Sequence, residues 1–138
     1  MNGEFIGNLK MRYLGDGQWR LLDSFTYKRP NGDIISAPRK MDTDLASIPD
    51  GFILGAIARA AIRKLGKHVR SAVIHDALYS ALADVYDKDG NTVTGLYTRK
   101  DADKVLNEAM VTEGETWGKR RIIYRAVRMF GGKHFTRP

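Results

Sequence analysis

The sequence predicts an α+β fold in which an N-terminal antiparallel β-meander is followed by about four α-helices packed on it. Turn signals and alternating large residues dominate the first 48 residues, whereas helical spacing of apolar residues dominates after them. Strands followed by helices are typical of α+β folds rather than of alternating βαβ folds. We expect one domain over residues 1–138, with a meander at 1–48, a helical part at 49–131 and a basic tail at 132–138.

Composition narrows the class of protein. With 138 residues, 43% hydrophobic and 28% charged, the chain is long enough to fold around one core without disulfides. It contains no cysteine, which excludes thiol catalysis and cysteine-ligated zinc. The first four residues (MNGE) lack the basic and apolar regions of a signal peptide. We therefore expect a protein made in a reducing cytoplasm.

Three strands are expected in the meander, over residues 5–14, 18–28 and 33–37. The segments at 15–17 (GDG) and 29–33 (RPNGD) are turn signals between them. Along the second strand, large residues occupy odd-numbered positions, which predicts a sheet with one face on the core: Trp19, Leu21, Phe25 and Tyr27.

Four helices are expected after residue 49. The first, over residues 52–65, is apolar on nearly every side but shorter than the roughly 20 apolar residues that span a bilayer. The second covers residues 68–83, and a polar loop follows at 84–98. Thr98 caps the third helix, which runs to residue 113, with Asp101 in the capping-box position. Thr116 caps the fourth, which runs to residue 130 with Ile123, Val127 and Phe130 on its core face.

Three polar motifs lie in apolar surroundings, at residues 43–49 (TDLASIP), 75–79 (HDALY) and 99–103 (RKDAD). Burying a charged or polar group costs free energy unless the group is paired, hydrogen-bonded or bound to a metal. We therefore expect Asp44, His75 and Asp103 to converge in the fold, either as a functional site or as a buried polar network.

The helical motif at 75–79 offers catalytic groups. His75 is a candidate general base or metal ligand, Asp76 a second ligand, and Tyr79 a hydrogen-bonding or acid partner. The alternative is a buried His–Asp–Tyr network that ties the helix to the sheet.

The other two motifs supply supporting groups. Asp44 is a candidate ligand or orienting carboxylate, Thr43 is a supporting group, and Ser47 is a candidate nucleophile or hydrogen-bonding partner for a substrate. The alternative is a turn in which these side chains bond nearby backbone amides. Arg99 either pairs with Asp103 one turn on or faces a substrate phosphate or carboxylate. With Asp44, His75 and Asp103 as ligands, a divalent cation such as zinc, manganese or magnesium is a possible cofactor.

The net charge of +7 is concentrated in residues 116–138, which carry seven basic and no acidic side chains, while residues 1–115 are balanced. A localised basic surface attracts phosphates, anionic lipids or acidic proteins, whereas the alternative is a solvated helix face. If the partner is nucleic acid, we expect poor base selectivity, because no aromatic or amide side chain stands among these arginines. The predicted patch consists of Lys119, Arg120, Arg121, Arg125 and Arg128.

The chain resembles a family of small phage and prophage proteins of unknown function. The resemblance covers most of the chain and includes the aromatic strand around residue 19, the three polar motifs and the closing segments at 108–110 (EAM) and 124–131. The resemblance implies a viral origin, with the protein in the cytoplasm of a host cell, in a virion or in both, and it carries no activity. The segment after Pro49 is longer and more helical here than is usual in the family.

Three functions follow as alternatives. The first is a virion-associated or late-stage phage protein for assembly, tail or lysis, with other phage structural proteins or nucleic acid as partners. The second is a metal-dependent hydrolase that acts on peptidoglycan or nucleic acid through the polar motifs. The third is an inhibitor of a host factor.

Overall fold

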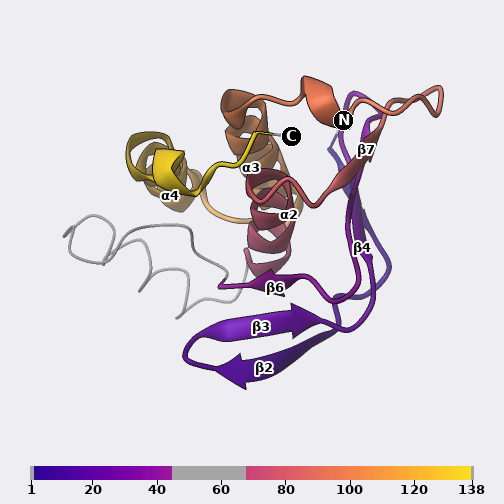
Figure 1. The fold of residues 1–138 in the computed structure, drawn as a ribbon. Coiled ribbons are helices and arrows are strands. Elements are labelled where there is room, and N and C mark those ends of the chain that lie inside the picture. The colour runs from indigo at the N-terminus through magenta and orange to yellow at the C-terminus, as the bar shows by residue number, and fades with distance from the viewer. Residues whose placement is uncertain (1, 45–67, 138) are drawn as a thin grey trace.

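The computed structural model describes residues 2–44 and 68–137. Its α+β class, with an N-terminal antiparallel region before the helices, confirms the prediction, and three α-helices occur in the described part. The predicted helix at 52–65 lies outside these residues. The elements in Figure 1 are β1 (Glu4–Ile6), β2 (Met11–Gly15), β3 (Gln18–Leu21), β4 (Phe25–Lys28), β5 (Ile34–Ala37), β6 (Asp42–Thr43), α2 (Val69–Tyr79), β7 (Asp84–Tyr86), α3 (Arg99–Thr112) and α4 (Trp117–Phe130), with 3₁₀ turns at Thr94–Leu96 and Gly131–His134.

The strands form two antiparallel sheets rather than the predicted single meander. One sheet has the strand order β1-β4-β5-β7, and the other has the order β2-β3-β6. In the first sheet Phe5 of β1 lies opposite Tyr27 of β4, and Tyr27 lies opposite Ile35 of β5. The chain therefore passes between the sheets several times before it reaches α2.

Two breaks in the predicted strands explain this difference. The segment at 5–14 is interrupted at Gly7, whose φ of 81° takes the backbone out of the extended region. The segment at 18–28 is interrupted after Leu21, whose N–H donates to Met41 O at 2.9 Å before β4 begins at Phe25. Each break moves the chain from one sheet to the other.

The segment predicted as a polar loop at 84–98 contains a strand. β7 extends the four-stranded sheet, and its Val85 is buried opposite Ile35. Val85 is the one apolar residue of β7 that the core can bury, because side chains alternate along a strand. The rest of the segment includes the 3₁₀ turn at Thr94–Leu96.

The three described helices lie close to their predicted positions. α2 ends at Tyr79, four residues before the predicted end, and Ala81 then adopts a left-handed φ of 57° that stops the helix. α3 begins after Thr98, and the predicted capping box with Asp101 is present. α4 begins after Thr116, whose side chain makes no capping hydrogen bond. None of these helices has the length and apolar character needed to cross a membrane.

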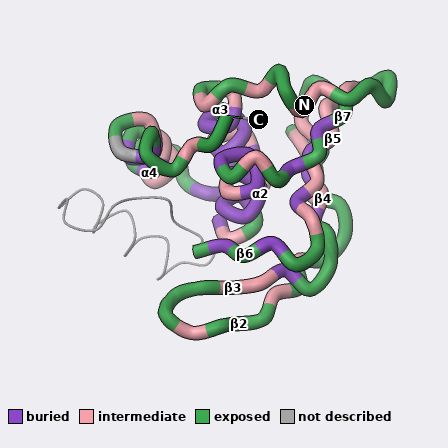
Figure 2. Tube along the Cα trace, viewed as in Figure 1, coloured by how far each residue is buried: buried purple, intermediate pink, exposed green. Residues whose placement is uncertain are grey.

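The core lies between α2 and the four-stranded sheet. α2 packs against β4, β5 and α3, and α3 packs against α4. Figure 1 shows α2 and α3 between this sheet and α4, and Figure 2 shows that burial is concentrated along α2. α4 is attached to α3 through a separate apolar cluster: Leu106, Met110, Ile123, Ala126 and Val127. The side chain of Phe130, predicted in this face, lies outside the described atoms.

Candidate functional site

The buried carboxylate of Asp103, on α3, is the centre of a polar cluster. Its Oδ1 atom lies 2.8 Å from His75 Nε2 and accepts a hydrogen bond from Tyr79 Oη at 2.6 Å. Its Oδ2 atom accepts a hydrogen bond from Arg128 Nη1 at 2.7 Å. These side chains come from α2, α3 and α4, so one carboxylate ties the three described helices together.

The contacts of Asp103 determine the protonation of its neighbours. Burial alone would raise the pKa of Asp103, but the hydrogen bonds from His75, Tyr79 and Arg128 outweigh burial and hold that pKa below its ordinary value. Asp103 is therefore a carboxylate at neutral pH and can only accept hydrogen bonds. It follows that His75 Nε2 carries the shared hydrogen. Burial, and then the bond to Asp103, raise the pKa of Tyr79, which stays a neutral phenol.

Arg99 joins the cluster by a different contact from the predicted one. Both residues are described, yet Arg99 and Asp103 do not form the expected ion pair one turn apart. Instead Arg99 Nη2 donates to the carbonyl oxygens of Val127 at 2.8 Å and Arg128 at 2.5 Å, and Arg99 Nε donates to Tyr79 Oη at 3.3 Å. The last carbonyls of a helix lack partners within it, so the end of α4 offers Arg99 ready acceptors.

A second polar contact joins β6 to α2. Thr43 Oγ1 donates a hydrogen bond to Asp76 Oδ2, and Thr43 is buried while Asp76 is half-buried. Asp76 follows His75 directly, yet Asp76 meets Thr43 while His75 meets Asp103, because neighbouring positions on a helix point about 100° apart. Thr43 and Asp76 therefore support the junction between sheet and helix.

The candidate metal ligands are not assembled as a set. Asp44 is exposed at the end of the first described segment, and Ser47 lies outside the described residues. Within residues 2–44 and 68–137, no three His, Asp or Glu side chains are placed so that they could hold a metal ion. His75 and Asp103 do meet, but both oxygens of Asp103 already accept hydrogen bonds from protein groups. Chemically, this carboxylate orients a histidine and neutralises an arginine.

Sequence reasoning missed a buried pair at the base of α2. His68 Nδ1 lies 2.8 Å from Glu115 Oε2, and both side chains are buried. Burial would raise the pKa of Glu115, but the bonds from His68 and from the N–H of Thr116 hold it below its ordinary value. Glu115 follows the end of α3 by three residues, and no local pattern marks it as buried.

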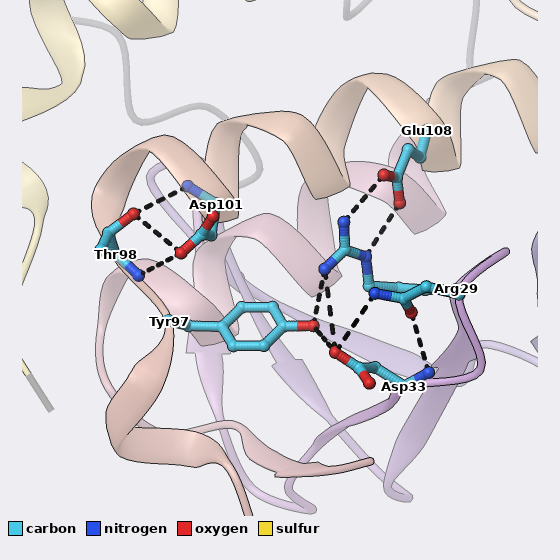
Figure 3. Close-up of polar contacts among 7 residues, drawn as sticks. Arg29, Asp33, Tyr97, Thr98, Asp101 and Glu108 are labelled. Carbon is cyan, nitrogen blue, oxygen red and sulfur yellow. Dashed lines mark hydrogen bonds and ion pairs between the residues drawn. The ribbon is translucent and has the colours of Figure 1, made fainter. Parts of the chain in front are cut away.

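A second missed network ties the β4–β5 hairpin to α3. Figure 3 shows Arg29 between Glu108 and Tyr97, with Nε and Nη2 donating to the two Glu108 oxygens at 2.9 and 2.8 Å. Arg29 Nη1 donates to Tyr97 Oη at 2.7 Å, and this hydroxyl donates to Asp33 at 2.5 Å. Glu108 belongs to the closing segment that carries the family resemblance, which is the one signal that pointed to it. The network is structural, because each polar group is paired within it.

The basic end differs from its prediction in two respects. Arg128 turns inward to Asp103, so it does not belong to an outward patch. Lys119 Nζ lies 3.9 Å from Glu115 Oε1, while Arg121 and Arg125 are exposed. Aromatic and amide side chains do stand among the arginines, contrary to the prediction. They line a shallow hollow: Asn107, Trp117, Arg120, Arg121 and Tyr124.

Comparison with known proteins gives one match. The family model described as "Protein of unknown function (DUF1353)" matches residues 19–127, well over half of the chain. No curated protein and no solved structure matches. The matched range includes Asp103 with His75 and Tyr79, the Arg29 network and most of α4, and it ends one residue before Arg128.

Proposed function

For a chain that belongs to the DUF1353 family and whose polar cluster is saturated by internal contacts, we propose a binding role in a phage or prophage, as a virion-associated or late-stage protein. The observation that carries this proposal is the state of Asp103. This side chain is 0% exposed, and His75, Tyr79 and Arg128 occupy its two oxygens. A carboxylate so occupied stabilises the arrangement of helices rather than acting on a substrate.

The viral origin rests on the sequence. The three polar motifs and the closing segments resemble those of small phage and prophage proteins. The family model covers all three polar motifs. In the described contacts, each of these motifs joins one element of the fold to another.

The exposed side of α4 supports a contact role. It carries large apolar side chains at Trp117, Ile122 and Met129 together with the cations Arg121 and Arg125. Exposed apolar groups among like charges are typical of interaction surfaces rather than of a merely solvated helix. A neighbouring subunit or an anionic polymer is the partner that this surface fits.

The test follows the protein through a phage cycle. A prophage-bearing host is induced, and the protein is quantified by mass spectrometry across the time course and in gradient-purified particles. The proposal expects the protein late after induction, in particles, or both. Constant low expression that ignores induction, with absence from particles, would refute it.

A metal-dependent hydrolase is the second candidate, favoured by the contact between His75 and Asp103. A carboxylate that fixes one ring nitrogen as a donor leaves the other nitrogen of a neutral imidazole as an acceptor, the form of a general base. Metal analysis of the purified protein, with peptidoglycan and nucleic-acid cleavage assays, tests this candidate. It requires a stoichiometric metal and a cleavage activity that His75→Ala abolishes.

A further inference from the structure

We propose that the hollow between α3 and the start of α4 binds single-stranded nucleic acid, with an unpaired base stacked on Trp117. The inference rests on the proposed function only in taking α4 as the contact surface. The hollow draws one residue from α3 and four from α4: Asn107, Trp117, Arg120, Arg121 and Tyr124. It combines an exposed aromatic ring, two cations and two groups that both donate and accept hydrogen bonds.

Trp117 supplies the stacking surface. Trp117 is 66% exposed, although removing the large apolar area of an indole from water is favourable. The guanidinium carbon of Arg121 lies 5.3 Å from the centre of the ring. Beside this contact, two thirds of the tryptophan remains open to solvent. A flat base can stack on the open part of the ring while the contact with Arg121 orients it.

The cations of the hollow are placed to meet phosphates. Arg120 Nη1 donates to Glu115 O at 2.8 Å, which holds this guanidinium at the start of α4. Arg121 is exposed, and residues 116–138 contain no acidic side chain. Each phosphate that they neutralise releases counterions, which favours binding at low salt.

The remaining groups favour single strands over duplexes. Asn107 and Tyr124 carry an amide and a hydroxyl, which can bond to the edge of a base. A duplex hides the faces of its bases and offers the indole nothing to stack on, whereas an unpaired base presents both face and edge. An acidic protein segment would satisfy the arginines but would leave the exposed indole without a flat partner. Single-stranded nucleic acid uses every group in the hollow.

The test compares the affinity of the full chain for a labelled deoxythymidine oligomer of about 15 nucleotides and for a duplex of equal length, by fluorescence anisotropy at low salt. The single strand should bind more tightly. Trp117→Ala should weaken this binding by about 5- to 150-fold, the value expected for one lost stacking contact. Trp117→Phe should retain part of the affinity because it keeps a ring. Leu96→Ala is the matched control, since Leu96 is an apolar side chain 73% exposed in the 3₁₀ turn before α3 and lies outside both α4 and the hollow.

A second pair of variants separates the hollow from general charge. Arg121→Gln and Arg125→Gln remove equal charges from exposed positions on α4, but only Arg121 lines the hollow. Arg121→Gln should weaken binding more and flatten its salt dependence by about 0.7 in log–log slope, the share of one phosphate contact. In a Trp19→Phe background Trp117 is the one remaining tryptophan of two, and the oligomer should quench its fluorescence.

Two results would overturn the inference. The first is equal affinity for single strand and duplex, with Trp117→Ala indistinguishable from Leu96→Ala, which describes a surface that binds by charge alone. The second is absence of binding at low salt, which leaves either a protein contact or a merely solvated helix face. Either result would overturn this inference and leave the proposed function standing if the protein is found in particles. Conversely, if the single strand stacks on Trp117 but the protein is absent from particles and does not respond to induction, the proposed function fails and this inference stands.

Discussion

Arg128 of α4 donates a hydrogen bond to the buried Asp103 of α3 at 2.7 Å, and this contact turns inward a cation that helical spacing places on the outer face. The side chain of Arg128 is 33% exposed, so the pair is only partly removed from water. Together with the bonds from Arg99 to the last carbonyls of α4, it sets the orientation of a helix that otherwise packs through a small apolar cluster. The outward face of α4, with its hollow, depends on that orientation.

Arg128→Gln should destabilise the protein by about 1–3 kcal/mol, because it removes a charged partner from the buried Asp103. The partial exposure of Arg128 keeps the cost below the 3–5 kcal/mol or so of a fully buried pair. Arg125→Gln is the control, and its exposed position should change stability by no more than about 0.5 kcal/mol. Urea denaturation measures both. Equal midpoints for the two variants would show that the contact with Asp103 is without energetic weight.

His75→Ala should cost far more stability than His134→Ala. His75 is buried and its loss leaves Asp103 one donor short, at about 1–3 kcal/mol, whereas His134 is exposed in the 3₁₀ turn after α4. Thermal unfolding followed by circular dichroism compares the two variants. A melting temperature for His75→Ala that matches His134→Ala would contradict the structural role of the cluster.

Acidification should remove the stability that Asp103 contributes. Its pKa in the folded state lies below the unfolded value, so its contribution is complete above about pH 4 and is lost as the pH falls through the folded pKa. Asp103→Asn should therefore lose less stability than the wild type between neutral pH and the acid range. Asp23→Asn, at an exposed position, should keep the wild-type pH profile. Parallel profiles for wild type and Asp103→Asn would show that Asp103 has the same pKa folded and unfolded.

Arg29→Lys should destabilise the protein although it keeps the charge. A lysine cannot reproduce the two parallel bonds from Arg29 to Glu108 together with the bond to Tyr97 (Figure 3). We expect a cost of about 1–3 kcal/mol by urea denaturation. Arg39→Lys makes the same substitution at an exposed residue and should lie within about 0.5 kcal/mol of wild type. If both variants unfold at the wild-type midpoint, the bidentate geometry contributes nothing.

Local signals predicted the helices well. The Thr98–Asp101 capping box marks the start of α3, and the helical spacing of its apolar residues gives that helix one buried face: Ala102, Val105, Leu106, Ala109 and Met110. These features involve residues within one or two turns of each other, so the sequence of a short segment is sufficient to specify them. The prediction that His75 and Asp103 meet, although they are 28 positions apart in the chain, used a different argument: two buried polar groups each needed a partner.

Strand pairing was not predictable in the same way. Turn signals and alternating large residues indicated strands in the first 43 positions, yet only the structure assigns β1 to β4 and β2 and β6 to β3. Every extended segment offers the same backbone donors and acceptors, so pairing depends on which apolar faces meet in the core. No local sequence pattern indicates that β7, which follows α2 in the chain, pairs with β5.

By itself, the sequence determined the α+β class, the positions of α3 and α4, and the need of His75 and Asp103 for partners. Only the tertiary structure decided which partners they took. Arg128 reached Asp103 instead of solvent, Arg99 bonded the end of α4 instead of Asp103, and Trp117 remained exposed beside Arg121. Helix starts are specified by contacts a few residues apart, whereas the partner of a long charged side chain depends on how whole helices pack, which no local pattern encodes.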